Sequence, residues 1–189
     1  MNQTAKDRAI EILAVIFTIA CVWLTAEERM ACWPTGIVGC LLYICVFYKA
    51  RLYSDVLLQL YFLLTSIWGW YNWAHGGARG GALSVGRLSS GEIGLVLIIV
   101  MLGTAALGRL MQRYTRAALP YWDAATTVLS FVAQYLLTYK VLENWALWIV
   151  ADIIDTGIYF SRRLYATSLL YAVLLVLAIR GLLEWLTRI

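Results

Sequence analysis

Long apolar segments dominate the sequence and constrain its fold more than any other feature. Each is close to the roughly 20 residues that an α-helix needs to cross a hydrocarbon core about 30 Å thick. Of the 189 residues, 62% are hydrophobic and only 14% are charged, which is too apolar for a domain that presents its surface to water. We therefore predict a single all-α transmembrane domain over residues 1–189, with seven helices at 9–26, 33–50, 53–73, 91–111, 121–139, 143–161 and 164–186.

Charge and cysteine usage argue against several classes of function. The net charge of +4 comes from arginines gathered between apolar segments, so it indicates membrane topology and no nucleic-acid surface. The four cysteines have no CxxC spacing and His75 is the only histidine, which argues against a metal site. The connection over residues 75–87 is rich in glycine but lacks the lysine–serine pair of a phosphate loop. We expect a flexible linker there, and no cofactor, metal or nucleic-acid partner.

An internal repeat organises the seven segments. A shift of 112 positions pairs Trp33 with Trp145, residues 51–53 with 163–165, Gly69 with Gly181 and Trp73 with Trp185. Tryptophan, glycine and an Arg-Leu-Tyr triplet rarely coincide at one shift by chance. We interpret residues 9–73 and 121–186 as two triple-helix copies joined by a linker helix at 91–111. Because three is an odd number, the linker helix restores the chain direction and makes the copies parallel, a 3+1+3 arrangement.

The distribution of lysine and arginine predicts the orientation in the membrane. One side, with the amino terminus, carries Lys6, Arg8, Lys49, Arg51, Arg109, Arg113, Arg116, Arg162 and Arg163. The other carries Arg29, Arg79, Arg87, Lys140, Arg180 and Arg188, partly beside glutamates. The bias predicts that the amino terminus lies inside the cell and the carboxyl terminus outside.

The sixth segment contains the strongest candidate for a ligand site. Residues three and four apart share a helix face, so Trp145, Trp148, Asp152 and Asp155 form one line, which we call the acidic stripe. A rise of about 1.5 Å per residue from Glu143 places Asp152 roughly 13 Å into the membrane. A carboxylate at that depth needs a proton, water or a positive ligand. The stripe therefore predicts a site for a cationic flat ring, since indole faces attract cations.

Structural alternatives apply to parts of this stripe. Trp145 lies at the mouth of the segment, where an interfacial aromatic belt would also place a tryptophan. Asp155 is close enough to Arg162 and Arg163 to extend toward them. Trp148 and Asp152 lie deeper, so we favour the ligand for both.

Polar side chains on two other segments could complete the site. Asn72 closes the third segment together with Trp70 and Trp73, although an aromatic belt with one polar cap is an equal alternative. Gln59 and Gln134 rank above the serines and threonines because a primary amide is costly to bury without partners. The further candidates are Ser66 on the third segment and Thr127 and Ser130 on the fifth, which could equally join helices by hydrogen bonds.

The repeat also predicts that the site is asymmetric. At the offset of 112, Asp152 aligns with Cys40 and Asp155 aligns with Tyr43. The first copy therefore has no acidic stripe, and we expect ligand contacts mainly from the second copy.

These motifs resemble the PnuC family of bacterial vitamin transporters, whose best known members carry nicotinamide riboside. The likeness spans about Trp33 to Trp185 and includes Trp33-Pro34 with Gly36, Phe47-Tyr48, Leu52-Tyr53, residues 69–73, Trp122-Asp123 and residues 143–152. The resemblance implies a SWEET-like 3+1+3 fold, a homotrimer in the bacterial inner membrane and facilitated diffusion of a substrate held near the midplane between the two bundles. In the family, two tryptophans and a polar residue four places later contact the substrate; here these are Trp145, Trp148 and Asp152.

One departure leaves the substrate open, because nicotinamide riboside carriers often have asparagine where this chain has Asp152. A carboxylate suits the pyridinium of nicotinamide riboside and equally the thiazolium of thiamine. We predict nicotinamide riboside uptake, with thiamine or another cationic heteroaromatic vitamin as the alternative. An intramembrane enzyme using Asp152 and Asp155 as an acid–base pair is a second alternative, but the sequence offers no nucleophile, metal cluster or phosphate motif. A purely structural subunit leaves the cost of Asp152 unexplained.

Overall fold

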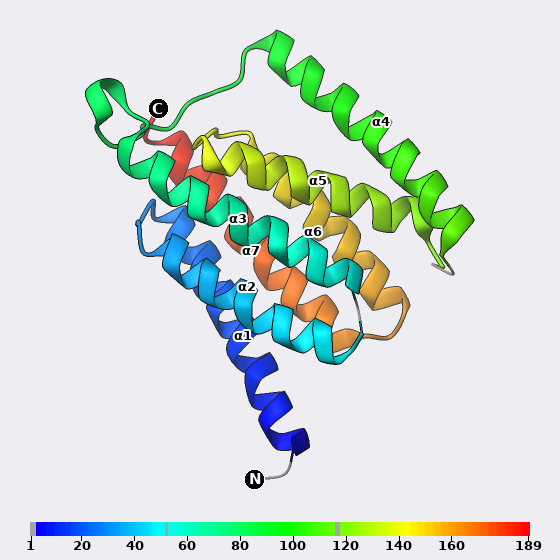
Figure 1. The fold of residues 1–189 in the computed structure, drawn as a ribbon. Helices are drawn as coiled ribbons and strands as arrows, with labels where there is room; N and C mark the ends of the chain where they lie inside the picture. The colour runs from blue at the N-terminus through cyan, green and yellow to red at the C-terminus, as the bar shows by residue number, and fades with distance from the viewer. Residues whose placement is uncertain (1–2, 52, 116–117) are drawn as a thin grey trace. The chain divides into compact units, whose positions relative to one another are not determined.

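The computed structural model describes residues 3–51, 53–115 and 118–189, which form seven α-helices and one short 3₁₀ helix (Figure 1). The all-α class predicted from the sequence is confirmed. The elements are α1 (Gln3–Ala26), α2 (Cys32–Lys49), α3 (Tyr53–His75), η1 (Ala78–Gly80), α4 (Ser90–Tyr114), α5 (Pro120–Thr138), α6 (Asn144–Ser161) and α7 (Tyr165–Leu186).

Helix boundaries depart from the apolar segments mainly where polar residues continue a helix. α1 begins at Gln3 instead of residue 9, and α4 ends at Tyr114 instead of residue 111. Backbone hydrogen bonding does not stop where apolar side chains stop, so a helix can extend beyond the hydrophobic stretch. At the start of α4, Ser89 and Glu92 form a capping box, which satisfies backbone N–H groups at that end.

Four helices of the described chain are long and apolar enough to cross a membrane: α1 from Lys6, α2, α4 and α7. The other three long helices, α3, α5 and α6, carry the amide and carboxylate side chains predicted for the site. The candidate site residues therefore lie on the three more polar helices and not on the four more apolar ones.

The chain divides into two compact units, Met1–Ser84 and Val85–Ile189. In the first unit, α2 packs against both α1 and α3. In the second unit, α5 packs against α4 and α6, and α6 packs against α7. Helices that follow one another in the sequence are therefore neighbours within each unit.

The four short turns between helices each contain a non-glycine residue in the left-handed conformation. Their φ angles are 57° at Glu28, 59° at Arg51, 55° at Lys140 and 59° at Arg163. The first and third are 112 positions apart, and so are the second and fourth. Backbone hydrogen bonds agree with this spacing: one joins Arg29 N to Leu24 O at 2.9 Å, and its counterpart joins Val141 N to Leu136 O at 3.1 Å. The two units thus use the same turn geometry at the offset found in the sequence.

Each unit also contains the same cluster of two tryptophans and a glycine, which we call the tryptophan clamp. In the first clamp, the rings of Trp33 and Trp73 meet edge to face at 5.1 Å and 88°. In the second clamp, the rings of Trp145 and Trp185 meet at 5.5 Å and 87°. An edge-to-face aromatic pair stabilises a protein by about 0.5–1.5 kcal/mol, in addition to the free energy gained by burying the apolar surface of the rings. The clamps therefore fasten α2 to α3 and α6 to α7.

A glycine makes room for each clamp. A Cβ at Gly69 would overlap ring carbons of Trp33, and a Cβ at Gly181 would overlap ring carbons of Trp145. The close approach requires the missing side chain, because packed interiors leave no space for an added methyl group. Trp33 and Trp145 are accordingly almost fully buried.

The linker between α3 and α4, which the sequence predicts to be flexible, is hydrogen-bonded along much of its length in the structure. In the first unit, Leu83 N donates to Trp73 O at 3.0 Å. In the second unit, Gly86 N donates to Lys140 O at 3.0 Å, and Leu88 N donates to Glu143 Oε2 at 3.1 Å. The backbone groups of this glycine-rich stretch find partners at the end of α3 and in the turn before α6, and composition alone does not reveal these hydrogen bonds.

We predict that Gly69→Ala and Gly181→Ala each lower the thermal unfolding midpoint in detergent, since overpacking of a filled core costs about 1–3 kcal/mol. Tryptophan fluorescence during heating measures the effect directly. Gly94→Ala is the matched control, because nothing lies within 4 Å of the Cβ it would add. An unchanged midpoint in both clamp variants would contradict the proposed role of the glycines.

Candidate functional site

The acidic stripe lies on α6, and Asp152 is at its middle. Counting from Asn144, Asp152 is about 12 Å along a helix that rises 1.5 Å per residue. Its side chain is buried, with 5% of the residue exposed. No described residue forms a hydrogen bond or an ion pair with its carboxylate. A buried carboxylate without a partner is destabilising, so this group is a candidate for ligand contact.

The electrostatic surroundings of Asp152 are negative. The neighbour whose charge acts on it is Asp155, one turn further along α6. Asp155 in turn interacts with the hydroxyl of Thr126 on α5 and with the charge of Asp123 at the start of that helix. The described residues give Asp155 no ion pair with Arg162 or Arg163. The acidic stripe therefore lacks a cation of its own.

The two tryptophans of the stripe have different environments. Trp145 is 2% exposed and forms the second clamp with Trp185, which makes it part of the scaffold of α6 and α7. Its indole Nε1 and the Oδ1 atom of Asn144 are buried and have no hydrogen-bond partner among the described residues. Trp148, about one turn deeper, is half-buried. Trp148 is therefore the indole of the stripe that remains partly accessible.

The predicted polar face of α5 lies on the helix that packs against α6. Gln134 is buried and Ser130 is half-buried on this helix. Thr127 donates its hydroxyl to Asp123 O at 2.7 Å, so it satisfies its own helix. The threonine that interacts with the stripe is Thr126, which the sequence reasoning missed. Its signal was the spacing of four residues that joins Thr126, Ser130 and Gln134 on one helix face.

The remaining candidates lie on α3 in the first unit. Trp73 is buried in the first clamp, whereas Trp70 is 42% exposed. Gln59 and Asn72 are half-buried, and Ser66 is buried near Gly36 of α2. The structure thus places the five predicted residues of α3 in the first unit, and the acidic stripe with the polar face of α5 in the second.

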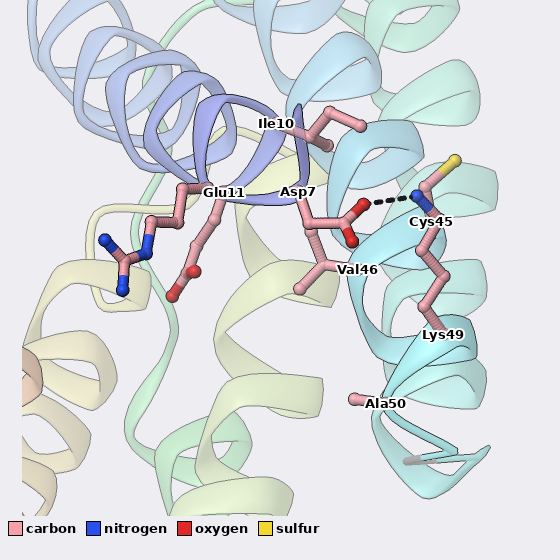
Figure 2. A pocket seen from close by; sticks show the side chains of 8 residues that line it. Asp7, Ile10, Glu11, Cys45, Val46, Lys49 and Ala50 are labelled. Carbon is pink, nitrogen blue, oxygen red and sulfur yellow. Dashed lines mark hydrogen bonds and ion pairs between the residues drawn. The ribbon is translucent and has the colours of Figure 1, made fainter. Parts of the chain in front are cut away.

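Each unit has a surface pocket among its described residues. The first, of about 280 Å³, lies between α1 and α2, where Lys49 Nζ and Asp7 Oδ1 form an ion pair at 2.6 Å across it (Figure 2). The second, of about 380 Å³, lies on α5 and α6 and is mainly apolar, with Trp122, Ile153 and Gly157 among its lining. Neither pocket is lined by Asp152 or Asp155.

Comparison with known proteins identifies the family. A family model described as nicotinamide mononucleotide transporter matches residues 8–187. The chain belongs to this transporter family. The chain is thus a multi-pass membrane transporter of a small molecule and no enzyme, as the sequence predicted.

Individual relatives agree with the family. The chain is 29% identical over 201 residues to the nicotinamide riboside transporter PnuC of Escherichia coli (strain K12), covering 93% of this chain and 84% of the relative. It is 25% identical over 159 residues to the riboflavin/roseoflavin transporter RibM of Streptomyces davaonensis, covering 82% and 74% of the two chains. A crystal structure of the vitamin B3 transporter PnuC matches with a TM-score of 0.74 and 25% identity, covering 96% of this chain and 82% of that one.

We predict that Asp152→Asn raises the thermal unfolding midpoint of the substrate-free transporter at alkaline pH, where carboxylates are ionised. The amide has the same shape without the charge, and an unsatisfied buried group costs about 1–3 kcal/mol, more when charged. Asp7→Asn is the control, because it makes the same chemical change in an exposed ion pair. A lower midpoint for Asp152→Asn would mean that the carboxylate is satisfied in the folded protein.

Proposed function

We propose that this transporter carries nicotinamide riboside across the bacterial inner membrane by facilitated diffusion. The observation that carries the proposal is Asp152, a buried carboxylate without a partner halfway along α6. Relatives named as nicotinamide riboside transporters support the choice of substrate. Nicotinamide riboside joins a flat cationic pyridinium to an uncharged sugar, which matches a site with the carboxylates of the acidic stripe and the amide of Gln134.

Each part of the substrate has a chemical counterpart in the acidic stripe and its surroundings. The carboxylate of Asp152 attracts the pyridinium strongly, because charges interact more in a low-dielectric interior than in water. The face of Trp148 adds a cation–π contact of about 0.5–2 kcal/mol. The amide of Gln134 can both donate and accept hydrogen bonds to ribose hydroxyls or the carboxamide. Asp155 supports the negative field, and Trp145 holds the start of α6 in place.

The candidates of the first unit, Gln59, Asn72, Trp70 and Trp73 of α3, stay predictions, and this unit lacks acidic residues in the middle of its α2. The aligned positions there are Cys40 and Tyr43. This difference supports an asymmetric site whose main contacts come from the second unit.

We further propose that residues 9–73 and 121–186 are copies of one triple-helix repeat, joined by the linker helix α4 in a 3+1+3, SWEET-like arrangement. The shared left-handed turns and tryptophan clamps at an offset of 112 support this proposal. The lysine and arginine bias supports a cytoplasmic amino terminus and a periplasmic carboxyl terminus. A homotrimer with one pathway per protomer is the assembly we propose from the resemblance.

Thiamine or another cationic heteroaromatic vitamin is the alternative substrate, because Asp152 selects charge and says little about the ring that carries it. A relative named for riboflavin supports the view that related transporters accept other ring vitamins. The enzymatic alternative is withdrawn, since the family is one of transporters.

Uptake into proteoliposomes tests the substrate. We expect radiolabelled nicotinamide riboside to equilibrate across vesicles containing the transporter much faster than across empty vesicles, with no nucleotide or sodium added. The same assay with labelled thiamine distinguishes the alternative. If neither solute enters faster than through empty vesicles, the transport proposal is wrong.

We predict that Trp148→Ala weakens nicotinamide riboside binding about tenfold, the effect of losing roughly 1.4 kcal/mol of ring contact. Binding to the purified protein is measured by calorimetry. Trp23→Ala is the matched control, since Trp23 is an exposed tryptophan on α1. Equal affinities for the two variants would remove Trp148 from the site.

We predict that Asp152→Asn shifts preference toward dihydronicotinamide riboside, which has a similar shape but no positive charge on its ring. The ratio of affinities for the charged and neutral ribosides should fall about tenfold or more, because the amide removes the charge attraction. Competition between the two ribosides in the uptake assay measures this ratio. A ratio equal to that of the unaltered protein would exclude a charge contact at Asp152.

A further inference from the structure

We propose that the surface pocket on α5 and α6 binds one anionic phospholipid, with an acyl chain in the apolar groove and the phosphate against Arg162 and Arg163. The groove has a volume of about 380 Å³ and lies between the start of α5 and the second half of α6. This site lies outside the acidic stripe and does not depend on which vitamin the transporter carries.

The groove follows a face of α6 that the acidic stripe does not use. Ile153, Gly157 and Ser161 line it at a spacing of four residues, so they follow one another along one side of the helix. A Cβ added at Gly157 would meet nothing within 4 Å, which leaves the middle of the groove open. Ile153 on one wall and Trp122 on the other are each 54% exposed. In a membrane protein, such an open apolar groove faces lipid.

The repeat places a hollow at the same position in both units. At the offset of 112, residues that line the pocket of the second unit correspond to residues that line the pocket of the first. The corresponding pairs are Leu119 and Asp7, Trp122 and Ile10, Gly157 and Cys45, Ile158 and Val46, and Ser161 and Lys49. The hollow is therefore a feature of the repeated pair of helices and not an accident of one surface.

The two hollows differ in what closes them. In the first unit, Asp7 and Lys49 point toward one another across the pocket and form an ion pair at 2.6 Å (Figure 2). In the second unit, the corresponding residues are Leu119 and Ser161, which cannot form an ion pair. The first hollow is thus closed by the protein's own charges. The second stays apolar and open, which suits an acyl chain.

Positive charge lies directly beyond the open groove. Arg162 and Arg163 follow Ser161 in the sequence, and both are exposed. Neither arginine forms an ion pair within residues 3–51, 53–115 and 118–189. Asp123 of α5 and Asp155, the last acidic residue of α6, do not line the groove. Because a guanidinium group can bind a phosphate through two parallel hydrogen bonds, this end of the groove suits a phospholipid headgroup.

Two further arginines lie at the same end of the second unit. The end of α4 lies beside the start of α5, since Tyr121 donates its hydroxyl to Gln112 Oε1 at 3.4 Å. Arg109 and Arg113, in the last turns of α4, are exposed. This end lies on the side of the membrane that we propose faces the cytoplasm. The basic residues there attract anionic lipids of that leaflet.

The headgroup provides the selectivity, because the acyl chain cannot. Lipid tails are as apolar as the side chains that they contact, so an acyl chain in the groove gains no hydrophobic free energy over one in the bilayer. Phospholipids with the same chains therefore differ only in how they interact with the arginines. One arginine near the membrane surface favours an anionic lipid about fivefold, so two favour it roughly thirtyfold.

Native mass spectrometry of the purified transporter tests this preference. We titrate it with phosphatidylglycerol and phosphatidylethanolamine that have identical acyl chains, and we expect the first bound phosphatidylglycerol to be held roughly thirtyfold more tightly. Equal affinities would mean that the groove contacts lipid without selecting it, and would overturn the assignment. Glycerol 3-phosphate carries the phosphate without a tail and should not displace the lipid. Displacement by it would show that the ligand is a phosphate anion and not a lipid.

Arg163→Gln, compared with Arg51→Gln, tests the position of the headgroup. The two arginines are aligned at the offset of 112, are both exposed and have the same φ of 59°. We expect Arg163→Gln to weaken phosphatidylglycerol binding about fivefold and Arg51→Gln to leave it unchanged, because the ion pair closes the pocket beside Arg51. Equal effects of the two variants would mean that the preference is a general property of surface charge.

Gly157→Leu tests the groove itself. Its side chain fills the open space, so we expect weaker binding of both lipids and loss of the preference for phosphatidylglycerol. Gly94→Leu on α4 is the matched control, since a Cβ there also meets nothing within 4 Å. If Gly157→Leu leaves the lipid affinities unchanged but alters the mass of the assembly, the groove is a contact between copies of this chain and the lipid site is wrong. If Gly157→Leu does not fold, the comparison of Arg163→Gln with Arg51→Gln decides.

Discussion

An uncompensated carboxylate in the interior of α6 is the constraint on which the functional interpretation of this transporter depends. Burying a charge is expensive unless a partner offsets it, and the described residues next to Asp152 contribute only further negative charge. A fold selected for stability alone would place an apolar or amide side chain there. Residues at functional sites often reduce stability in this way, because the missing partner is the ligand.

The two units share their framework and differ in their chemistry. Turn geometry and tryptophan clamps recur at an offset of 112, so the same local solutions hold α2 against α3 and α6 against α7. The aligned position of Trp148 is Gly36, where an added Cβ would lie 2.9 Å from Cys21 Sγ. The first unit therefore has a glycine, packed close to Cys21, where the second has an indole.

The apolar segments made the helices predictable, because their length and composition match the demands of a bilayer. Spacing along α6 likewise predicted which side chains share the acidic stripe. Other features depended on tertiary contacts that no local pattern encodes: the burial of Trp145 against Trp185, the contact of Thr126 with Asp155, and the hydrogen bonds that hold the glycine-rich linker. The spacing of residues along a helix predicts which side chains share a face. Which residues those side chains contact depends on how the adjoining helices pack.

The left-handed arginines have a consequence for how such a chain enters the membrane. Arg51 and Arg163 occupy backbone conformations that glycine adopts without strain, at a cost of about 1–2 kcal/mol for other residues. Glycine would relax both hairpins, but it would also remove the fixed positive charge that marks a loop for retention during insertion. Conformational strain in the finished protein is thus tolerated at two hairpins whose fixed positive charges contribute to the lysine and arginine bias.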